Sequence, residues 1–210
     1  MPRRRRVYPD GLALHVINRG NKRARIFKEP ADFDDFLEAM AAAIEQTAMR
    51  LLAFCLMTNH WHLVLWPRRP SDLSAFMQKL MNRHIRVYQK RHGTVGTGHI
   101  YQGRFKSVAI EDERQLLSVC RYVDANPVRA GLVDRAEAWP WCDLSSPAAP
   151  SGAPLLSEWP ITRPTNWLEL VNVPLGEDKL KPIRNAITRA RQLTAIPKIA
   201  ETASSNVELS

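Results

Sequence analysis

Residues 51–66 read LLAFCLMTNHWHLVLW, which is two apolar runs separated by Thr58 and Asn59. Apolar runs of this length, bounded by turn residues, are typical of buried β-strands. We therefore predict a strand over 51–57, a turn, and a second strand over 60–66. Two strands joined by so short a turn pair as an antiparallel β-hairpin.

The segments on either side extend this hairpin into a larger sheet. Pro30 suits the first turn of a preceding helix, and Ser71 or Asp72 can cap a following one. The order strand, helix, strand, strand, helix, strand, helix is typical of an α+β domain, with one ferredoxin-like antiparallel sheet and helices packed on it. The other predicted elements are strand 12–18, helix 30–49, helix 71–91, strand 105–110 and helix 111–126.

Composition divides the chain into three regions. We expect residues 1–7 to be a basic, flexible arm and residues 8–145 to be the folded domain. Residues 146–165 hold five prolines, which predict an irregular linker or an extended wrap. Together with the residues that follow it, this segment forms a C-terminal extension over 146–210. We expect the extension to continue with a short basic helix over 177–194 and to end in a disordered tail.

The chain has the balance of a globular protein, with 45% hydrophobic and 24% charged residues. No apolar run approaches the roughly 20 residues of a membrane helix, and residues 1–7 lack the apolar stretch of a secretory signal. We therefore expect a cytoplasmic protein without a membrane partner. The cysteines form no CxxC pair, which argues against a disulfide framework and a thiolate zinc site; they are Cys55, Cys120 and Cys142.

The net charge of +9 indicates a polyanionic partner, most often nucleic acid. Residues 73–110 contain no Asp or Glu at all. Within the predicted helix over 71–91, four basic side chains recur at helical spacing and form a stripe beside the apolar one. We expect that stripe, the basic and aromatic residues at the exit of the glycine-rich segment 93–103, and one arginine further on to contact DNA: Lys79, Arg83, Arg86, Lys90, Tyr101, Arg104, Lys106 and Arg129.

The second strand of the hairpin carries a histidine pair. Side chains two apart on a strand share a face, so His60 and His62 point one way. Two neighbouring imidazoles can hold one metal ion. The residues that alternate with them are expected to face the core: Trp61, Leu63 and Leu65.

A tyrosine and an asparagine four residues apart form a second constellation. Tyr122 and Asn126 share a face of the predicted helix over 111–126. Both fall beside its apolar stripe, on the flank of Gln115, which predicts that Tyr122 is not a core residue.

Together the two constellations describe a reaction on DNA. A tyrosine oxygen can attack a phosphodiester and form a covalent phosphotyrosine, which conserves the energy of the broken bond. A cation held by the histidine pair, with the Asn126 amide oxygen as third ligand, would offset the developing charge. Tyr122 lies near the negative end of its helix, so Arg121 and Arg129 are expected to assist.

Four segments resemble the REP-associated tyrosine transposases of the single-tyrosine HUH superfamily: NRGNKR, MTNHWHLVLWP, YQGRFKS and YVDANPVRAGLV. The resemblance covers roughly residues 8–145. It implies a ferredoxin-like domain, Mg²⁺ or Mn²⁺ as cofactor, and single-stranded or hairpin DNA as substrate, cut and joined near a short guide sequence at repetitive extragenic palindromes. It also implies that His60 and His62 are the HUH histidines, Tyr122 the nucleophile and Asn126 the last metal ligand.

The resemblance is weaker at the C-terminus, where residues 188–192 read TRARQ in place of the family's Arg-Gly-x-Pro-Gly-like string. An alternative is a nucleic-acid-binding module without chemistry, in which Trp66 and Tyr101 would stack on bases. A replication-initiating or relaxase-like HUH nuclease is a third possibility, but no helicase region or second tyrosine motif is visible. The sequence leaves open whether the protein is a monomer or a homodimer.

Overall fold

The computed structural model describes residues 11–146 and 148–190. Four strands form one antiparallel sheet in the order β2-β3-β1-β4. This is the predicted ferredoxin-like arrangement, in which two strand-helix-strand units interleave. In chain order the main elements are β1 (Ala13–Arg19), α1 (Pro30–Thr47), β2 (Arg50–Met57), β3 (His60–Trp66), α2 (Pro70–Arg91), β4 (Lys106–Ile110), α3 (Glu113–Asp124), α4 (Asn126–Arg129), α5 (Trp167–Asn172) and α6 (Glu177–Arg189). Short 3₁₀ turns lie at Asn21–Arg23 and Ala136–Ala138.

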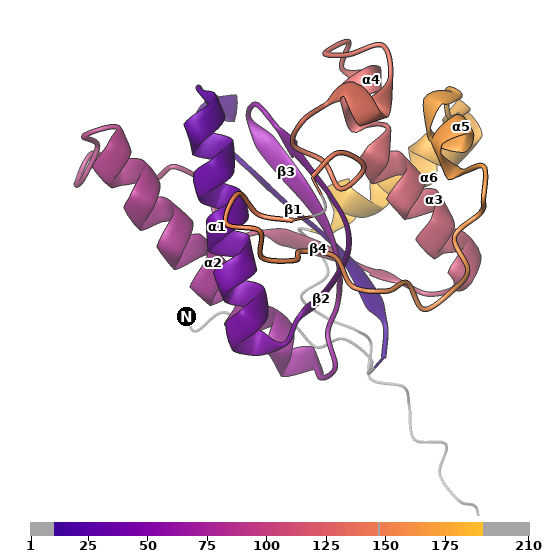
Figure 1. Cartoon of the computed structure of the whole chain (residues 1–210), viewed down its shortest axis with the longest axis horizontal. Helices are drawn as coiled ribbons and strands as arrows, with labels where there is room; N and C mark the ends of the chain where they lie inside the picture. Colours follow the sequence, from indigo (N-terminus) through magenta and orange to yellow (C-terminus); the bar gives the residue numbers. More distant parts are fainter. Residues whose placement is uncertain (1–10, 147, 191–210) are drawn as a thin grey trace, which may run out of the picture.

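The sheet lies between two layers of helices. In Figure 1, α1 and α2 cover one face, and α3 to α6 lie on the opposite side. The predicted core face is confirmed, because Leu63 stands between Val16 on β1 and Phe54 on β2, and all three are fully buried. No described helix is long and apolar enough to cross a membrane.

The predicted helix over 111–126 is divided in two. α3 ends at Asp124, and α4 begins at Asn126 after Ala125. Pro127 lacks an amide hydrogen and fits only in a first helical turn, which is where α4 has it. α4 therefore follows α3 after a single residue, and Tyr122 lies in the last turn of α3.

The proline-rich segment lies along β2, the edge strand. The amide of Leu56 donates to Trp141 O (2.9 Å), and that of Ser157 donates to Leu51 O (2.8 Å). The indole of Trp159 donates to Leu52 O (2.8 Å). This wrap occupies backbone groups that an open edge would offer to another chain. The predicted arm over 1–7 and the predicted disordered tail lie outside the described residues.

Two buried carboxyl groups near the end of α3 accept hydrogen bonds, one from the C-terminal extension and one from β2. Asp124 Oδ2 accepts from the indole of Trp167 (2.8 Å), and Asp143 Oδ1 accepts from the amide of Phe54 (3.1 Å). Burial and the neighbouring charge of Asp143 raise the pKa of Asp124 well above its ordinary 3.8. An acid whose pKa is higher in the folded state holds its proton more tightly there, so this pair lowers stability as pH rises above 3.8.

Replacing Asp124 by Asn should therefore flatten that pH dependence and keep the acceptor for Trp167. As pH rises from 5 to 8, we expect the free energy of unfolding of the variant to increase relative to that of wild type, because the variant has no buried carboxyl proton to lose. Urea denaturation at both pH values measures this. The exposed Asp134→Asn, which changes the charge equally, should show no such gain, and an equal gain in both variants would contradict the assignment.

Candidate functional site

Three histidines lie together on the sheet face that α3 covers. His60 and His62 share this face on β3, as predicted, and His15 joins them from β1. Nε2 of His15 is 2.9 Å from Nδ1 of His62, with the two rings stacked. The ring centroids of His60 and His62 are 5.0 Å apart.

The surroundings keep these imidazoles neutral. Burial, with help from Arg19 and Arg129, lowers the pKa of His60 to about 4. Burial lowers the pKa of His15 to about 4 and that of His62 well below its usual value. Each neutral ring therefore carries one nitrogen with a lone pair, which can accept a hydrogen bond or ligate a cation. Nε2 of His62 is buried and has no hydrogen-bond partner, which fits a nitrogen that ligates a cation.

Tyr122 is buried, with 6% of its surface exposed, so the prediction that it lies outside the core is wrong. Its ring packs edge-on against His62 and His15, with centroid distances of 5.7 and 6.0 Å. A residue beside the apolar stripe of α3 is exposed to solvent only if the sheet does not also cover that side of the helix. Here the sheet covers both the stripe and the side that carries Tyr122, which packs against the histidines.

Asn126 is tied to the same tyrosine through the backbone. Its Nδ2 donates to Tyr122 O (3.0 Å) and Val123 O (3.2 Å). Its Oδ1 accepts from Nη1 of Arg129 (3.1 Å). The amide oxygen is therefore directed away from the helix, and a cation there would take the place of this guanidinium contact.

Arg129 lies over the tyrosine, and Arg121 does not. The guanidinium carbon of Arg129 is 4.6 Å from the Tyr122 ring centroid, a cation–π contact that offsets the negative end of α3. Nη2 of Arg121 donates instead to Val173 O (2.9 Å) in the extension. Of the two predicted assisting arginines, the structure places only Arg129 at the site.

The other predicted DNA contacts divide between two places. Arg104 is exposed and follows Gln102, whose amide donates to the carbonyl of Arg19 (3.0 Å), so it belongs to the sheet end nearest His60. Lys106 lies opposite Ile17 on the histidine face, and its Nζ donates to Ile187 O in α6 (3.2 Å).

Tyr101, which the sequence predicts to contact DNA, lies in the hydrophobic core of the domain. It is 5% exposed, and its hydroxyl contacts Nδ1 of His84 (2.9 Å) and accepts from the indole of Trp61 (3.1 Å). Trp66 is also engaged, because the guanidinium carbon of Arg50 lies 3.3 Å from its ring centroid. Both sheet faces are covered, so the aromatic stacking platform of the alternative hypothesis is not open to a base.

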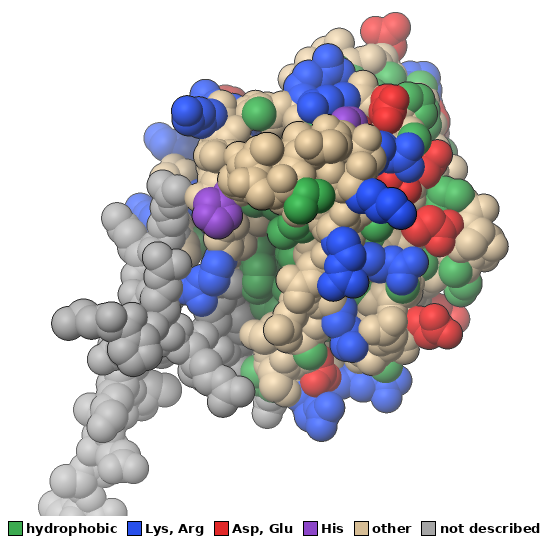
Figure 2. Space-filling model, turned by 90° about the vertical axis from the view of Figure 1, so that its left-hand side faces the viewer, with side chains coloured by type: hydrophobic (Ala, Val, Ile, Leu, Met, Phe, Trp, Pro, Cys, Tyr) green, Lys and Arg blue, Asp and Glu red, His purple; other side chains and the backbone are tan. Residues whose placement is uncertain are grey.

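The basic stripe on α2 lies in the helix layer on the other side of the sheet from Tyr122 (Figure 1). Figure 2 looks at this layer and shows lysine and arginine side chains over its middle, with acidic ones along one side. Nζ of Lys79 donates to Gln46 (3.0 Å), and Arg83 borders a surface hollow with Glu38 and Glu45. The basic side chains of α2 are exposed, as predicted, but the sheet separates them from the histidines.

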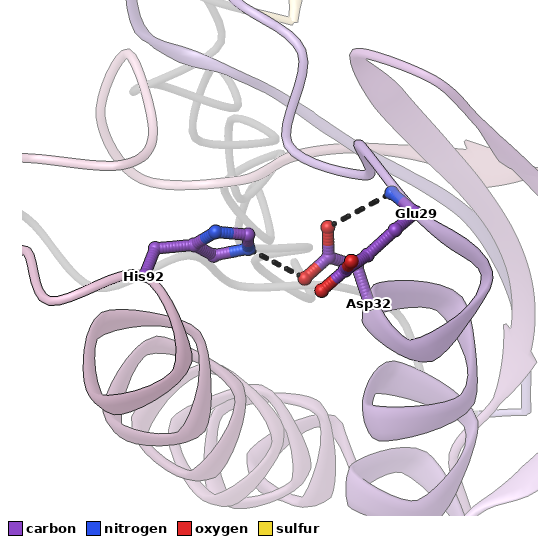
Figure 3. A group of neighbouring side chains, drawn as sticks. All are labelled: Glu29, Asp32 and His92. Atoms are coloured by element: carbon purple, nitrogen blue, oxygen red, sulfur yellow. Dashed lines mark hydrogen bonds and ion pairs between the residues drawn. The ribbon is translucent and has the colours of Figure 1, made fainter.

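Glu29, Asp32 and His92 form the one group of three acidic or histidine side chains, among the described residues, whose ligand atoms lie within 4.8 Å of one another (Figure 3). Asp32 Oδ2 accepts from the amides of Lys28 and Glu29, and Oδ1 is 2.7 Å from Nε2 of His92. Nε of Arg91 lies 4.0 Å from the same carboxylate. These contacts cap α1 and join it to the end of α2, which accounts for the group without a cation.

Sequence reasoning missed two residues of the site, His15 and Arg19. Both lie on β1 at alternate positions and so share a face, but the sequence does not say which face. Cross-strand register supplies that information, since Ile17 pairs with His62 and Arg19 pairs with His60.

The lowered pKa of His60 predicts a neutral imidazole throughout mildly acidic solution. We expect the His60 ring signals in NMR spectra to stay constant from pH 8 to pH 5.5, whereas an ordinary histidine is mostly protonated at the lower end. The His60→Gln variant assigns the signals. A midpoint near 6.5 would show that neither burial nor the arginines act as described.

Comparisons with known proteins agree with this geometry. The sequence model of the family "Transposase IS200 like" matches residues 10–126, which is more than half of the chain and contains the histidine pair, Tyr122 and Asn126. A Haemophilus influenzae protein with the provisional name REP-associated tyrosine transposase is 24% identical over 119 residues, covering 51% of this chain and 68% of that protein.

A solved structure shares the fold. It is that of a REP-associated tyrosine transposase bound to a REP hairpin, with a TM-score of 0.56 and 19% identity, covering 79% of this chain and 96% of the other. These matches confirm the resemblance to REP-associated tyrosine transposases. Because the family match spans more than half of the sequence and includes the whole histidine and tyrosine site, the chain belongs to the IS200-like transposases, enzymes that process DNA.

Proposed function

We propose that this transposase cuts and rejoins single-stranded DNA through a covalent bond to Tyr122, with a divalent cation held by His60, His62 and Asn126. One observation carries the proposal above the others. The Tyr122 ring lies against His62, whose Nε2 is buried without a partner. A tyrosine ring packed against a histidine that has an unpartnered ring nitrogen supports a reaction in which the tyrosine is the nucleophile and the histidine ligates a cation.

The chemistry assigned to Tyr122 is a transesterification. Its phenolic oxygen forms a bond to a backbone phosphorus, the bond from phosphorus to a sugar oxygen breaks, and the phenolic proton leaves with the departing hydroxyl or to solvent. The number of phosphoester bonds is unchanged, so the reverse step needs no ATP. Arg129, whose guanidinium lies over the ring, would pair with a phosphate beside Tyr122.

The residues present fit a divalent cation. Two neutral imidazoles and an amide oxygen are a donor set that suits Mn²⁺, and Mg²⁺ less well. The cation, when bound, would offset negative charge on the phosphate under attack. Asn126 would then exchange its contact with Arg129 for the cation and free that guanidinium for the DNA.

The proposed substrate is a hairpin from a repetitive extragenic palindrome. The names of the Haemophilus relative and of the solved structure support this choice. The Tyr122 ring contacts the His62 ring of its own chain, which supports cleavage within one subunit, whether the protein is a monomer or a homodimer.

The covalent step is tested with labelled single-stranded palindromic DNA and Mn²⁺, followed by denaturing electrophoresis. Wild-type protein should give a slower, protein-linked band that is absent with Tyr122→Phe and absent in EDTA. Tyr88→Phe, which removes the hydroxyl of a buried tyrosine on α2, should still give the band. Tight binding of wild type without any such band would favour a binding module without chemistry.

The path of the DNA backbone is tested by neutralising two basic side chains near the histidines and, separately, two on α2. Neutralising Arg19 and Arg104 should weaken DNA binding and reduce the slope of log affinity against log salt by roughly one for each lost phosphate contact. The same change at Arg86 and Lys90 should have a smaller effect, because α2 lies across the sheet from Tyr122. Equal losses in the two double variants would show that the DNA also wraps around α2.

A further inference from the structure

His15 contacts a proposed metal ligand from the neighbouring strand. It pairs across the sheet with Val64, so its ring reaches diagonally toward His62. The two rings are almost completely buried, and the distance of 2.9 Å between Nε2 of His15 and Nδ1 of His62 is that of a hydrogen bond. A hydrogen bond between two ring nitrogens holds a single hydrogen, which is bonded to one nitrogen and accepted by the other.

The position of that hydrogen decides whether His62 can ligate a cation. If His15 donates, His62 carries its own hydrogen on Nε2. That hydrogen would be buried without an acceptor, and no lone pair would face the site. If His62 donates from Nδ1, its Nε2 keeps a lone pair, which is the form that a cation binds.

His60 shows the same arrangement with an unambiguous partner. Its Nδ1 is 2.7 Å from Oδ1 of Asn59, and an amide oxygen can only accept. The orientation of the Asn59 amide follows from its Nδ2, which donates to Arg23 O (3.2 Å). His60 therefore carries its hydrogen on Nδ1 and its lone pair on Nε2.

We propose that His15 is a positioning residue that accepts the Nδ1 hydrogen of His62 and so presets the Nε2 lone pair of that ligand for the cation. The inference rests on the proposed function of the histidine pair. It gives His62 the tautomer that Asn59 imposes on His60. Hydrogen-bond acceptors behind a ligand histidine, such as carboxylates and carbonyl groups, fix both its ring orientation and its tautomer.

If Nε2 of His15 accepts from His62, the neutral His15 ring carries its own hydrogen on Nδ1, and this hydrogen needs an acceptor. His15 borders a cavity of about 220 Å³ between β4, α3 and α6, which is also lined by Gln115 and Ser118. A cavity of this size with polar groups in its wall can hold a water that accepts from Nδ1 of His15. Such a water would extend the hydrogen bond between His15 and His62 to the cavity.

Long-range ¹H–¹⁵N NMR of histidine-labelled protein without metal tests the tautomer directly. In wild type we expect both His60 and His62 to be protonated on Nδ1. In His15→Leu, His62 should become protonated on Nε2 or a mixture of forms, while His60 stays unchanged. A wild-type His62 protonated on Nε2 would overturn the proposal.

Mn²⁺ titration, followed by electron paramagnetic resonance, tests the consequence. His15→Leu should weaken binding about 10- to 100-fold, the range found when such outer partners are removed. His15→Gln keeps an acceptor oxygen near the position of Nε2 and should restore most of the affinity. His84→Leu removes an equally buried histidine from the opposite side of the sheet and controls for lost packing.

The variants separate this inference from the proposed function. If wild type binds Mn²⁺ and His60→Gln does not, the metal site is established. Wild-type affinity in His15→Leu would then overturn the role of His15 alone, as would a loss in His15→Gln equal to that in His15→Leu. If wild type does not bind Mn²⁺, the proposed metal site and the role of His15 fail together.

Discussion

The register of β3 between β1 and β2 is the constraint on which the rest of this structure depends. Leu63 is held between Val16 and Phe54, and Trp61 pairs with Leu56 and packs near Phe36. A slip of one residue would turn every side chain of β3 to the other face. The large apolar residues would then meet α3, and the histidines would enter the core beneath α1 and α2. The packing that stabilises the domain therefore also fixes the face on which the histidines lie.

α3 buries the sheet face that carries the histidines, and this burial lowers their pKa values. Without this helix the histidines would lie on a solvated sheet and would titrate near their ordinary pKa. Beneath α3, burial keeps them neutral, and the break at Ala125 brings Asn126 and Arg129 to Tyr122. The burial leaves Nε2 of His62 without a hydrogen-bond partner among the described residues. A buried polar atom of this kind calls for an explanation, and a bound cation would supply one.

The C-terminal extension supports the same helix from behind. It covers the edge of β2, and Trp167 donates to Asp124, two residues after the tyrosine. Basic residues are distributed on both sides of the sheet, and Arg19, Arg104, Lys106 and Arg129 are among those on the side or end that carries the histidines. The whole-chain charge of +9 thus indicates a polyanionic partner without saying where it lies.

The sequence by itself determined the elements and their order, because alternation of two and helical spacing are local properties of the chain. It also determined that His60 and His62 share a face, and that Tyr122 is followed by Asn126 at a helical interval. Only the tertiary structure decided which face α3 covers, that Tyr122 is buried there, that Tyr101 belongs to the core, and that His15 and Arg19 join the site from β1. These facts depend on cross-strand register and on the packing of helices from distant parts of the chain, and no local pattern encodes either one.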